Sequence, residues 1–284
     1  MDTVIDRPTL HRLDGPFGVE VRGVAVGDCS DDVFAFVDDA FQHHGALVIR
    51  GQQLDPGQLH RFAARFGPLE AHTLQQYTLP GDPFIYVLSN IEVDGRPIGV
   101  HNEGIGWHTD LTYKRRPPMS TILYGLVCPP EGSDTLVADT CAAYEALPAA
   151  DKAALDGVKV LHSFQMLHDS RVGRAPLTPE QKAATPDVWH PLVRRHPRDG
   201  RKALYLGTGT VKAVEGMTQE EARRLVFRLV DFATQERFVY RHKWQAGDVL
   251  MWDNRCTLHT GTLFDDVRYK RHIHRLMMQG TEPV

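Results

Sequence analysis

The stretch Val249-Leu250-Met251-Trp252 is typical of a short strand, and Asp253-Asn254-Arg255 directly after it is typical of a turn. Segments of the same kind, short and rich in branched or aromatic residues, recur along the chain. About ten strands are expected in all, at residues 46–50, 84–89, 120–127, 135–139, 158–164, 191–196, 202–206, 238–243, 248–252 and 270–278. This number of strands excludes a helical bundle.

Three helices are expected among these strands. Residues 32–44 and 56–66 each place apolar side chains on one face at helical spacing. Thr218 and Glu221 form a capping box ahead of a third apolar segment. Because the strands are short, irregularly spaced and not alternated with helices, the sequence predicts a mainly β, α+β architecture, namely a two-sheet jelly roll with flanking helices.

Length and composition favour one domain over residues 1–284. Of the 284 residues, 42% are hydrophobic, which is enough for a sizeable core in one large domain. A segment around residues 165–190 is rich in proline, threonine and charged residues. We expect this segment to form a surface insertion or a lid.

Charge and cysteine usage exclude several classes of partner. A formal charge of -4 gives no basic field for a polyphosphate backbone, so nucleic acid is not expected as a partner. The four cysteines form no C-x-x-C pair, which argues against a zinc ribbon and fits a reducing compartment. The sequence shows neither a signal peptide nor an apolar run near the roughly 20 residues of a membrane span. A cytoplasmic protein without membrane contact is therefore expected.

Two H-x-D/E motifs offer candidate metal ligands, His101-Asn102-Glu103 and His108-Thr109-Asp110. The chain has 15 histidines, so one such match is expected by chance, and a hydrogen-bonded surface pair is the alternative explanation for each. On an extended strand, side chains at positions i and i+2 project from the same face and can reach one ion. The pair formed by His108 and Asp110 is the stronger candidate.

His259 is the candidate for a third ligand, because it follows the strand and turn at 249–255. By itself it would be an unremarkable histidine. Two histidines and one carboxylate on one side of an ion leave the other coordination positions open, which is the facial arrangement of non-haem Fe(II) oxygenases. The open positions suit the keto and carboxylate oxygens of a 2-oxo acid, together with O2.

A 2-oxo acid with a second carboxylate requires a cation at its far end. Arginine is preferred there, because its planar guanidinium pairs with a carboxylate through two hydrogen bonds and keeps its charge when buried. Arg271 and Arg275 share a face of the expected strand 270–278. The alternative is a solvated, basic edge strand.

Four separated motifs carry a resemblance to a known family. In chain order, they are Trp107-His108-Thr109-Asp110, then Asp134-Thr135-Leu136, then Trp252-Asp253-Asn254-Arg255 with His259, and then Arg271 with His274-Arg275. With these motifs the chain resembles the taurine and phenoxyacetate dioxygenase family of Fe(II)/2-oxoglutarate enzymes over most of its length. The resemblance implies a double-stranded β-helix fold and the metal ligands His108, Asp110 and His259.

The resemblance also implies how 2-oxoglutarate binds. Arg271, helped by the hydroxyl of Thr135, is expected to bind its distal carboxylate. Arg275 is expected nearer the metal, in contact with an anionic group of the substrate or with the proximal carboxylate of 2-oxoglutarate. The segment from His259 to Arg271 is one residue longer than in the taurine enzyme, which leaves Lys270 as an alternative to Arg271. The expected reaction hydroxylates a substrate carbon and releases succinate and CO2.

The substrate is expected to be a small anion. His72 lies where the taurine enzyme has a substrate-binding histidine, and with Arg275 it could hold an anionic group; an exposed loop histidine is the alternative. The run 206–210 lacks the aromatic residue of the taurine enzymes, and Gly104 replaces their substrate-binding asparagine. These differences favour another or bulkier acid, such as a sulfonate, a carboxylate or an aryloxy acid.

Two other functions are compatible with the same residues. Two histidines and a carboxylate also hold hydrolytic zinc, although a zinc hydrolase would leave Arg271 and Thr135 without a role. A jelly-roll binding protein without catalytic activity is the second alternative. The expected partner is a small-molecule substrate. The chain is also compatible with a homo-oligomer, either a dimer or a tetramer.

Overall fold

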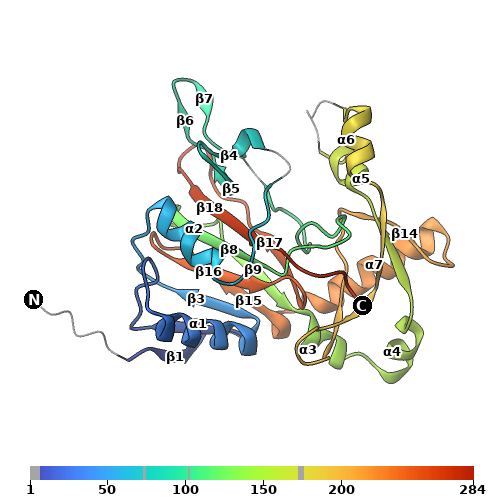
Figure 1. Ribbon diagram of the computed structural model, residues 1–284. Helices are drawn as coiled ribbons and strands as arrows, with labels where there is room; N and C mark the ends of the chain where they lie inside the picture. Colours follow the sequence, from blue (N-terminus) through green and yellow to red (C-terminus); the bar gives the residue numbers. More distant parts are fainter. Residues whose placement is uncertain (1–6, 73–74, 102, 172–175) are drawn as a thin grey trace, which may run out of the picture.

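The computed structural model describes residues 7–72, 75–101, 103–171 and 176–284, and Figure 1 shows its arrangement. The strands are β1 (Thr9–Arg12), β2 (Val19–Arg22), β3 (Ala46–Ile49), β4 (Thr78–Leu79), β5 (Asp82–Ser89), β6 (Glu92–Val93), β7 (Arg96–Pro97), β8 (Ser120–Val127), β9 (Thr135–Asp139), β10 (Lys159–His162), β11 (Val188–Pro191), β12 (Val193–Arg195), β13 (Lys202–Leu204), β14 (Val211–Val214), β15 (Val239–His242), β16 (Val249–Asp253), β17 (Thr257–Gly261) and β18 (His272–Met278). The helices are α1 (Asp31–His44), α2 (Pro56–Ala64), α3 (Thr140–Glu145), α4 (Ala149–Leu155), α5 (Phe164–Asp169), α6 (Pro179–Ala184) and α7 (Gln219–Ala233), with short 3-10 turns at Gln75–Tyr77 and Glu236–Phe238.

Two sheets form the centre of the molecule. The large sheet has the strand order β1-β2-β3-β16-β8-β18-β5-β4, and the small sheet has the order β15-β9-β17. Apart from the parallel pair β2 and β3, neighbouring strands in both sheets are antiparallel. Strands that are distant in sequence lie side by side, as a jelly roll requires. The predicted double-stranded β-helix is therefore confirmed.

The side chains of β16 show how alternation divides the core into layers. Leu250 and Trp252 point between the two sheets, where they pack with Val137 of β9 and Tyr240 of β15. The other face of the strand belongs to a second apolar cluster, which includes side chains from α1 and α2. Because successive residues of a strand point to opposite faces, one apolar strand can serve both layers.

Helices cover the outer faces of both sheets. Helices α1 and α2 lie on one side of the strands in Figure 1, and α3 and α7 lie on the other. Phe41 and Phe62 pack against the large sheet, whereas Val226 and Leu229 belong to a cluster that includes Leu258 of the small sheet. The two sheets thus lie between layers of helix.

The helix boundaries follow from capping chemistry that is visible in the sequence. The predicted capping box is present at the start of α7. The Thr218 side chain accepts a hydrogen bond from the backbone NH of Glu221, and the Glu221 carboxylate accepts one from the backbone NH of Thr218. Asp55 forms the corresponding box at α2. Helix α1 ends at Gly45, whose φ of +67° is the left-handed conformation that glycine adopts without strain.

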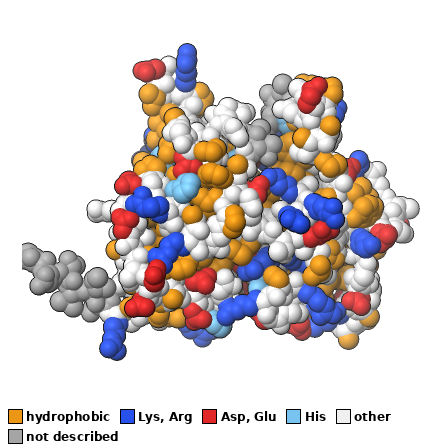
Figure 2. Space-filling view, viewed as in Figure 1, with side chains coloured by type: hydrophobic (Ala, Val, Ile, Leu, Met, Phe, Trp, Pro, Cys, Tyr) orange, Lys and Arg blue, Asp and Glu red, His pale blue; other side chains and the backbone are white. Residues whose placement is uncertain are grey.

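The segment around 165–190 has more regular structure than its composition predicts. It contains most of α5, the whole of α6 and the start of β11, while residues 172–175 lie outside the described residues. The space-filling view shows α6 and the β6–β7 hairpin as two separate projections on the same side of the molecule (Figure 2). Acidic and basic side chains are interspersed on the face drawn there.

Two local expectations are corrected by the structure. His108 makes only a single antiparallel bridge, and Asp110 begins a turn, so the motif does not lie on a continuous strand. Leu111 in that turn has a φ of +46°, which ends any extended run. Strand β18 lies between β8 and β5 in the interior of the large sheet, so the alternative of a solvated edge strand is wrong.

No helix among the described residues has the length and apolar character that crossing a membrane requires.

Candidate functional site

His108 and His259 are joined by their backbones. The NH of His108 donates to the carbonyl oxygen of His259 at 3.0 Å, and the NH of His259 donates back at 2.8 Å. This pair of bonds fixes the segment before Asp110 against β17, so the two imidazoles lie with their ring centroids 4.2 Å apart. Strand β17 was not expected from the sequence, although it carries the third candidate ligand.

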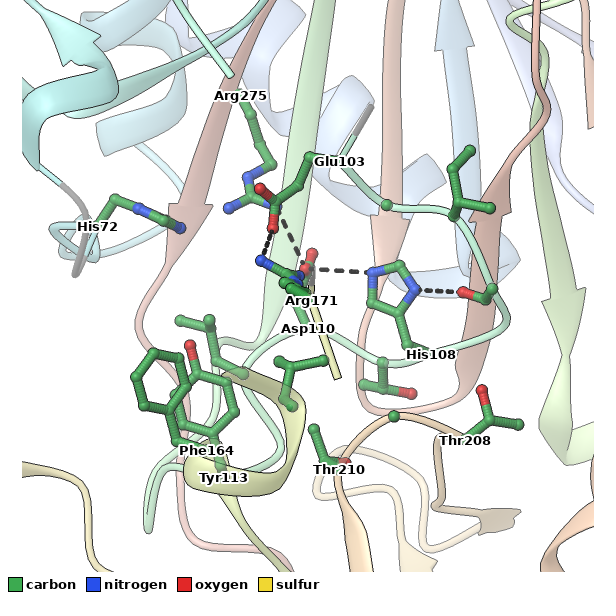
Figure 3. Close-up of a pocket in the computed structure, with 17 residues that line it drawn as sticks. His72, Glu103, His108, Asp110, Tyr113, Phe164, Arg171, Thr208, Thr210 and Arg275 are labelled. Carbon is green, nitrogen blue, oxygen red and sulfur yellow. Dashed lines mark hydrogen bonds and ion pairs between the residues drawn. The ribbon is translucent and has the colours of Figure 1, made fainter. Parts of the chain in front are cut away.

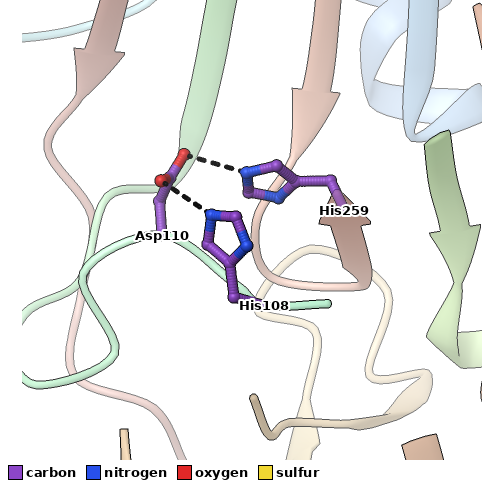
Figure 4. A group of neighbouring side chains, drawn as sticks. All are labelled: His108, Asp110 and His259. Atoms are coloured by element: carbon purple, nitrogen blue, oxygen red, sulfur yellow. Dashed lines mark ion pairs between the residues drawn. The ribbon is translucent and has the colours of Figure 1, made fainter. Parts of the chain in front are cut away.

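The three candidate ligands present their donor atoms to one point (Figure 4). Nε2 of His108 lies 3.9 Å from one carboxylate oxygen of Asp110, and Nε2 of His259 lies 3.7 Å from the other. One ligand atom from each of the three residues falls within 4.8 Å of the other two. Two imidazole nitrogens and a carboxylate oxygen match the facial donor set of a non-haem iron site.

The hydrogen bonding of His108 and the burial of His259 both suit metal binding. Nδ1 of His108 lies 2.7 Å from the carbonyl oxygen of Gly106, which can only accept, so Nδ1 is the donor and the lone pair of the neutral imidazole is on Nε2. Burial lowers the pKa of His259 to about 3, with a further contribution from His108. His259 is therefore neutral, as a ligand must be.

Asp110 is buried, yet it is held in its charged form. Burial alone would raise its pKa, but the electrostatic influence of the neighbouring His259, Arg275 and His108 side chains outweighs that effect and keeps the pKa well below the usual value. The hydroxyl of Thr121 also donates to its second oxygen at 2.6 Å. The carboxylate is thus ready to bind a cation.

A cavity of about 40 Å³ lies beside these ligands and is lined by Thr135, Arg271 and Arg275, among others. The guanidinium of Arg271 reaches Ser133 Oγ at 3.4 Å, while its Nε and second Nη have no partner among the described residues. Burial lowers the pKa of Arg271. No carboxylate among the described residues pairs with this buried guanidinium. Arg271 can therefore bind an anion that enters the cavity.

Thr135 and Lys270 are placed differently with respect to this cavity. The hydroxyl of Thr135 accepts a hydrogen bond from Trp244 Nε1 at 3.1 Å and lines the same cavity as Arg271. Lys270 is exposed. Of the two candidate cations, the arginine is the one that lines the cavity.

Arg275 lies between this cavity and a second one, since it lines both. One Nη atom is 3.5 Å from Asp110, and the guanidinium lies 4.8 Å above the ring of Tyr86. Its Nε has no partner in the described part of the chain. Arg275 can therefore bind another anion next to the candidate metal ligands.

The second cavity, of about 110 Å³, has one polar and one apolar side. In Figure 3, Glu103, Arg171 and Arg275 gather on one side, and Tyr113 and Phe164 stand on another. The two aromatic rings pack with their centroids 4.7 Å apart. Neither Tyr113 nor Phe164 could be singled out from the sequence, because they come from different segments and are not among the candidate site residues of any motif.

The residues considered for substrate binding line this cavity as well. His72 is only 7% exposed and stacks on Tyr86, so it is not an exposed loop histidine. Gly104 has a φ of +83°, and a Cβ there would stand 4.0 Å from the His108 ring. The run 206–210 contributes Thr208, Gly209 and Thr210, while the aromatic surface comes from Tyr113 and Phe164.

Two other clusters resemble metal sites and have other partners. In the first H-x-E motif, His101 pairs with Asp266 at 2.8 Å and Glu103 pairs with Arg171; Asn102 lies outside the described residues. The ligand atoms of His196, Asp253 and Cys256 also lie close together. There, however, Asp253 accepts two hydrogen bonds from the Arg255 side chain and one from His196, which is a buried structural ion pair.

Comparison with known proteins gives a consistent result. Residues 9–277 match the model of the family described as "Taurine catabolism dioxygenase TauD, TfdA family". An alpha-ketoglutarate-dependent 2,4-dichlorophenoxyacetate dioxygenase from Burkholderia sp. (strain RASC) is 36% identical over 259 residues, covering 86% of this chain and 84% of the relative. An alpha-ketoglutarate-dependent sulfate ester dioxygenase from Pseudomonas putida is 33% identical, covering 97% and 90%.

Solved structures agree with these relatives. A taurine dioxygenase from Burkholderia xenovorans superposes with a TM-score of 0.81 at 30% identity and covers 98% of this chain and 93% of its own. A structure of AAD-2 in complex with Mn(II) and N-oxalylglycine gives a TM-score of 0.78 at 29% identity, with 97% and 98% covered. The likeness extends over nearly the whole chain.

Proposed function

Because the chain belongs to the TauD/TfdA family of dioxygenases, we propose that its iron(II) ligands are His108, Asp110 and His259. The observation that carries the proposal is the approach of both Nε2 atoms to the two oxygens of one buried carboxylate. The donor set is two imidazole nitrogens and one carboxylate oxygen, which suits iron(II). Membership of a dioxygenase family supports neither of the two alternative functions, a zinc hydrolase or a binding protein without catalytic activity.

The cosubstrate 2-oxoglutarate binds in the smaller cavity. Its distal carboxylate pairs with Arg271, whose buried guanidinium otherwise lacks an acidic partner among the described residues. The hydroxyls of Ser133 and Thr135 line the same cavity and add hydrogen-bonding groups. When bound together, iron(II), 2-oxoglutarate and O2 supply an oxidant that hydroxylates a substrate carbon while 2-oxoglutarate is converted to succinate and CO2.

The chain itself positions the substrate and keeps water away. Arg275 and His72 bind an anionic group of the substrate, because both line the larger cavity and one guanidinium nitrogen of Arg275 has no partner in the described chain. Tyr113 and Phe164 pack against the apolar part of the substrate. The target carbon is thereby held beside the metal ligands, between a charged side and an aromatic side.

The substrate class that fits these two sides best is an aryloxy carboxylic acid. Its carboxylate suits Arg275, and its aromatic ring suits Tyr113 and Phe164. Hydroxylation of the carbon between the ether oxygen and the carboxylate gives a hemiacetal, which breaks into a phenol and glyoxylate. Relatives named for phenoxyacetate and phenoxypropionate support this class. The relative named for sulfate esters makes alkyl sulfates the second candidate.

The test is a screen for substrate-dependent succinate. The protein is incubated with Fe(II), 2-oxoglutarate, O2 and either phenoxyacetate, an alkyl sulfate or taurine, and succinate and phenol are quantified. We expect equal amounts of succinate and phenol from phenoxyacetate and little turnover of taurine. If only the alkyl sulfate gives succinate, the aryloxy proposal is wrong. If no succinate forms with any of the three compounds or in their absence, the dioxygenase proposal is contradicted.

The cysteines bear on the cellular setting. All four cysteines are free thiols in the structure, which supports a reducing compartment such as the cytoplasm. We further propose that residues 1–284 act as a single domain. The segment around 165–190 acts as a lid, since Phe164, Leu167 and Arg171 line the larger cavity. A homo-oligomer stays a prediction, which light scattering coupled to gel filtration will check.

A further inference from the structure

A chain of buried hydrogen bonds begins at Asp110 and leads away from the cavities. The carboxylate accepts from Thr121 Oγ1 at 2.6 Å, and that hydroxyl accepts from Asn254 Nδ2 at 2.8 Å. The carbonyl oxygen of Asn254 accepts from Trp252 Nε1 at 3.0 Å. Each of these side chains is at most 3% exposed, so the bonds are sheltered from competing water.

The same chain ends on a second candidate ligand. The indole of Trp252 packs against the imidazole of His259, with ring centroids 4.4 Å apart and planes inclined by 42°. Metal-binding histidines usually donate their second ring NH to a fixed acceptor, which sets the ring orientation. Nδ1 of His259 is buried and has no such acceptor in the described part of the chain. Ring packing is left to orient this imidazole.

Asn254 is the branch point between these two ligands. It lies in the short connection between β16 and β17, and its backbone NH donates to the carbonyl oxygen of Met119 at 2.9 Å, immediately before β8. Its amide NH2 fixes the hydroxyl of Thr121 on β8, and its amide oxygen fixes the indole of Trp252 on β16. An amide is well suited to this place, because it donates on one side and accepts on the other.

We propose that Asn254 is a positioning residue for the metal, which orients Asp110 through Thr121 and His259 through Trp252. The inference rests on the proposed function, because it takes these two side chains as metal ligands. Asn254 itself contacts neither ligand. Its effect is to hold two side chains from remote segments in one arrangement before the metal arrives, so that little reorganisation is needed on binding.

The experiment measures Mn(II) binding to the metal-free protein by calorimetry, together with the unfolding temperature of the same samples. Thr121→Val keeps the shape of the side chain and removes the hydroxyl, and Asn254→Leu removes both arms of the branch. We expect Mn(II) dissociation constants about 10- to 100-fold higher than in the wild type for each variant. Thr121→Ser restores the hydroxyl and should bind Mn(II) as the wild type does.

A matched control separates positioning from general loss of packing. Thr140 is fully buried, and its hydroxyl has no hydrogen-bond partner among the described residues. Thr140→Val should therefore leave Mn(II) affinity unchanged. Adding Thr121→Val to Asn254→Leu should weaken binding little further, because both substitutions interrupt the same chain.

The outcomes distinguish this inference from the function on which it rests. Wild-type affinity in Asn254→Leu or in Thr121→Val, an equal loss in Thr140→Val, or failure of Thr121→Ser to restore binding would each overturn the role of the chain. If Asn254→Leu does not fold, wild-type affinity in Thr121→Val would still overturn the proposal, because Asn254 reaches Asp110 only through the hydroxyl of Thr121. A wild-type protein that binds no Mn(II) would overturn the proposed metal site, and the role of Asn254 with it.

Discussion

The guanidinium of Arg171 lies 2.7 Å from the carboxylate of Glu103 at the polar side of the larger cavity, as Figure 3 shows. Glu103 belongs to the loop that leads to His108, whereas Arg171 follows α5. The ion pair therefore ties the proposed lid to the metal side of the cavity.

Arg171→Met should loosen this closure. We expect the Michaelis constant of the substrate to rise by up to about fivefold, because a partly exposed ion pair contributes at most about 1 kcal/mol. More 2-oxoglutarate should also be consumed per substrate oxidised, since water reaches the site more often. Both quantities are measured from succinate and product in one assay. Exchange of the charges, with Glu103→Arg and Arg171→Glu, should recover part of the loss, and Arg224→Met on the exposed face of α7 should have no effect.

Asp110→Ala should lower metal-dependent succinate formation by more than about 100-fold, because a direct ligand contributes more than the residues that orient it. The metal-free protein should still unfold cooperatively, since Asp110 lies at a cavity rather than in the apolar core. Asp110→Asn should behave in the same way, as an amide lacks the charge that iron(II) requires. Turnover close to that of the wild type in either variant would remove Asp110 from the ligand set.

Arg271→Met should raise the Michaelis constant for 2-oxoglutarate by about 10- to 100-fold, the value of a lost hydrogen-bonded charge pair. The unfolding temperature of the metal-free protein should not fall, because burial already disfavours this charge, as its lowered pKa indicates. Lys270→Ala is the matched control, since this exposed neighbour should leave the constant unchanged. The opposite ranking of the two variants would assign the distal carboxylate to Lys270.

Local patterns in the sequence were enough to predict the fold class and to propose a ligand set. Capping boxes act within three residues, and the apolar run of β16 is continuous, so both leave a clear local pattern. The His108 and Asp110 motif is informative for the same reason. His259 was found only because it follows a recognisable strand and turn, and the resemblance to a family made it specific.

The remainder of the site depends on contacts between distant segments. Strand β17 was missed because it is Thr257-Leu258-His259-Thr260-Gly261, in which buried polar residues replace the usual apolar alternation. Thr121 is a threonine in an apolar strand, and only the fold brings it to Asp110. Arg171 meets Glu103 in the same way. Such pairs have no local pattern, because each partner is ordinary in its own segment.

Buried neutral histidines should make the fold sensitive to acid. Burial lowers the pKa of His162 to about 3, with a smaller contribution from the neighbouring His190. In the unfolded chain the same imidazole titrates near 6.5. Between these values the unfolded state binds more protons than the folded state, so the free energy of unfolding falls as the pH falls. The loss from one such group approaches about 1.4 kcal/mol per pH unit.

His162→Asn keeps a polar group near Thr210, which lies 2.9 Å from Nδ1 of the imidazole, and removes the titration. Urea unfolding of the metal-free protein at pH 6.5 and pH 5 should show a smaller decrease for this variant, by up to about 2 kcal/mol over the interval. His11→Asn, at an exposed histidine, should keep the wild-type decrease. If the free energy of unfolding falls as much in His162→Asn as in the wild type, His162 takes up its proton in the folded protein. Its burial would then not contribute to acid unfolding.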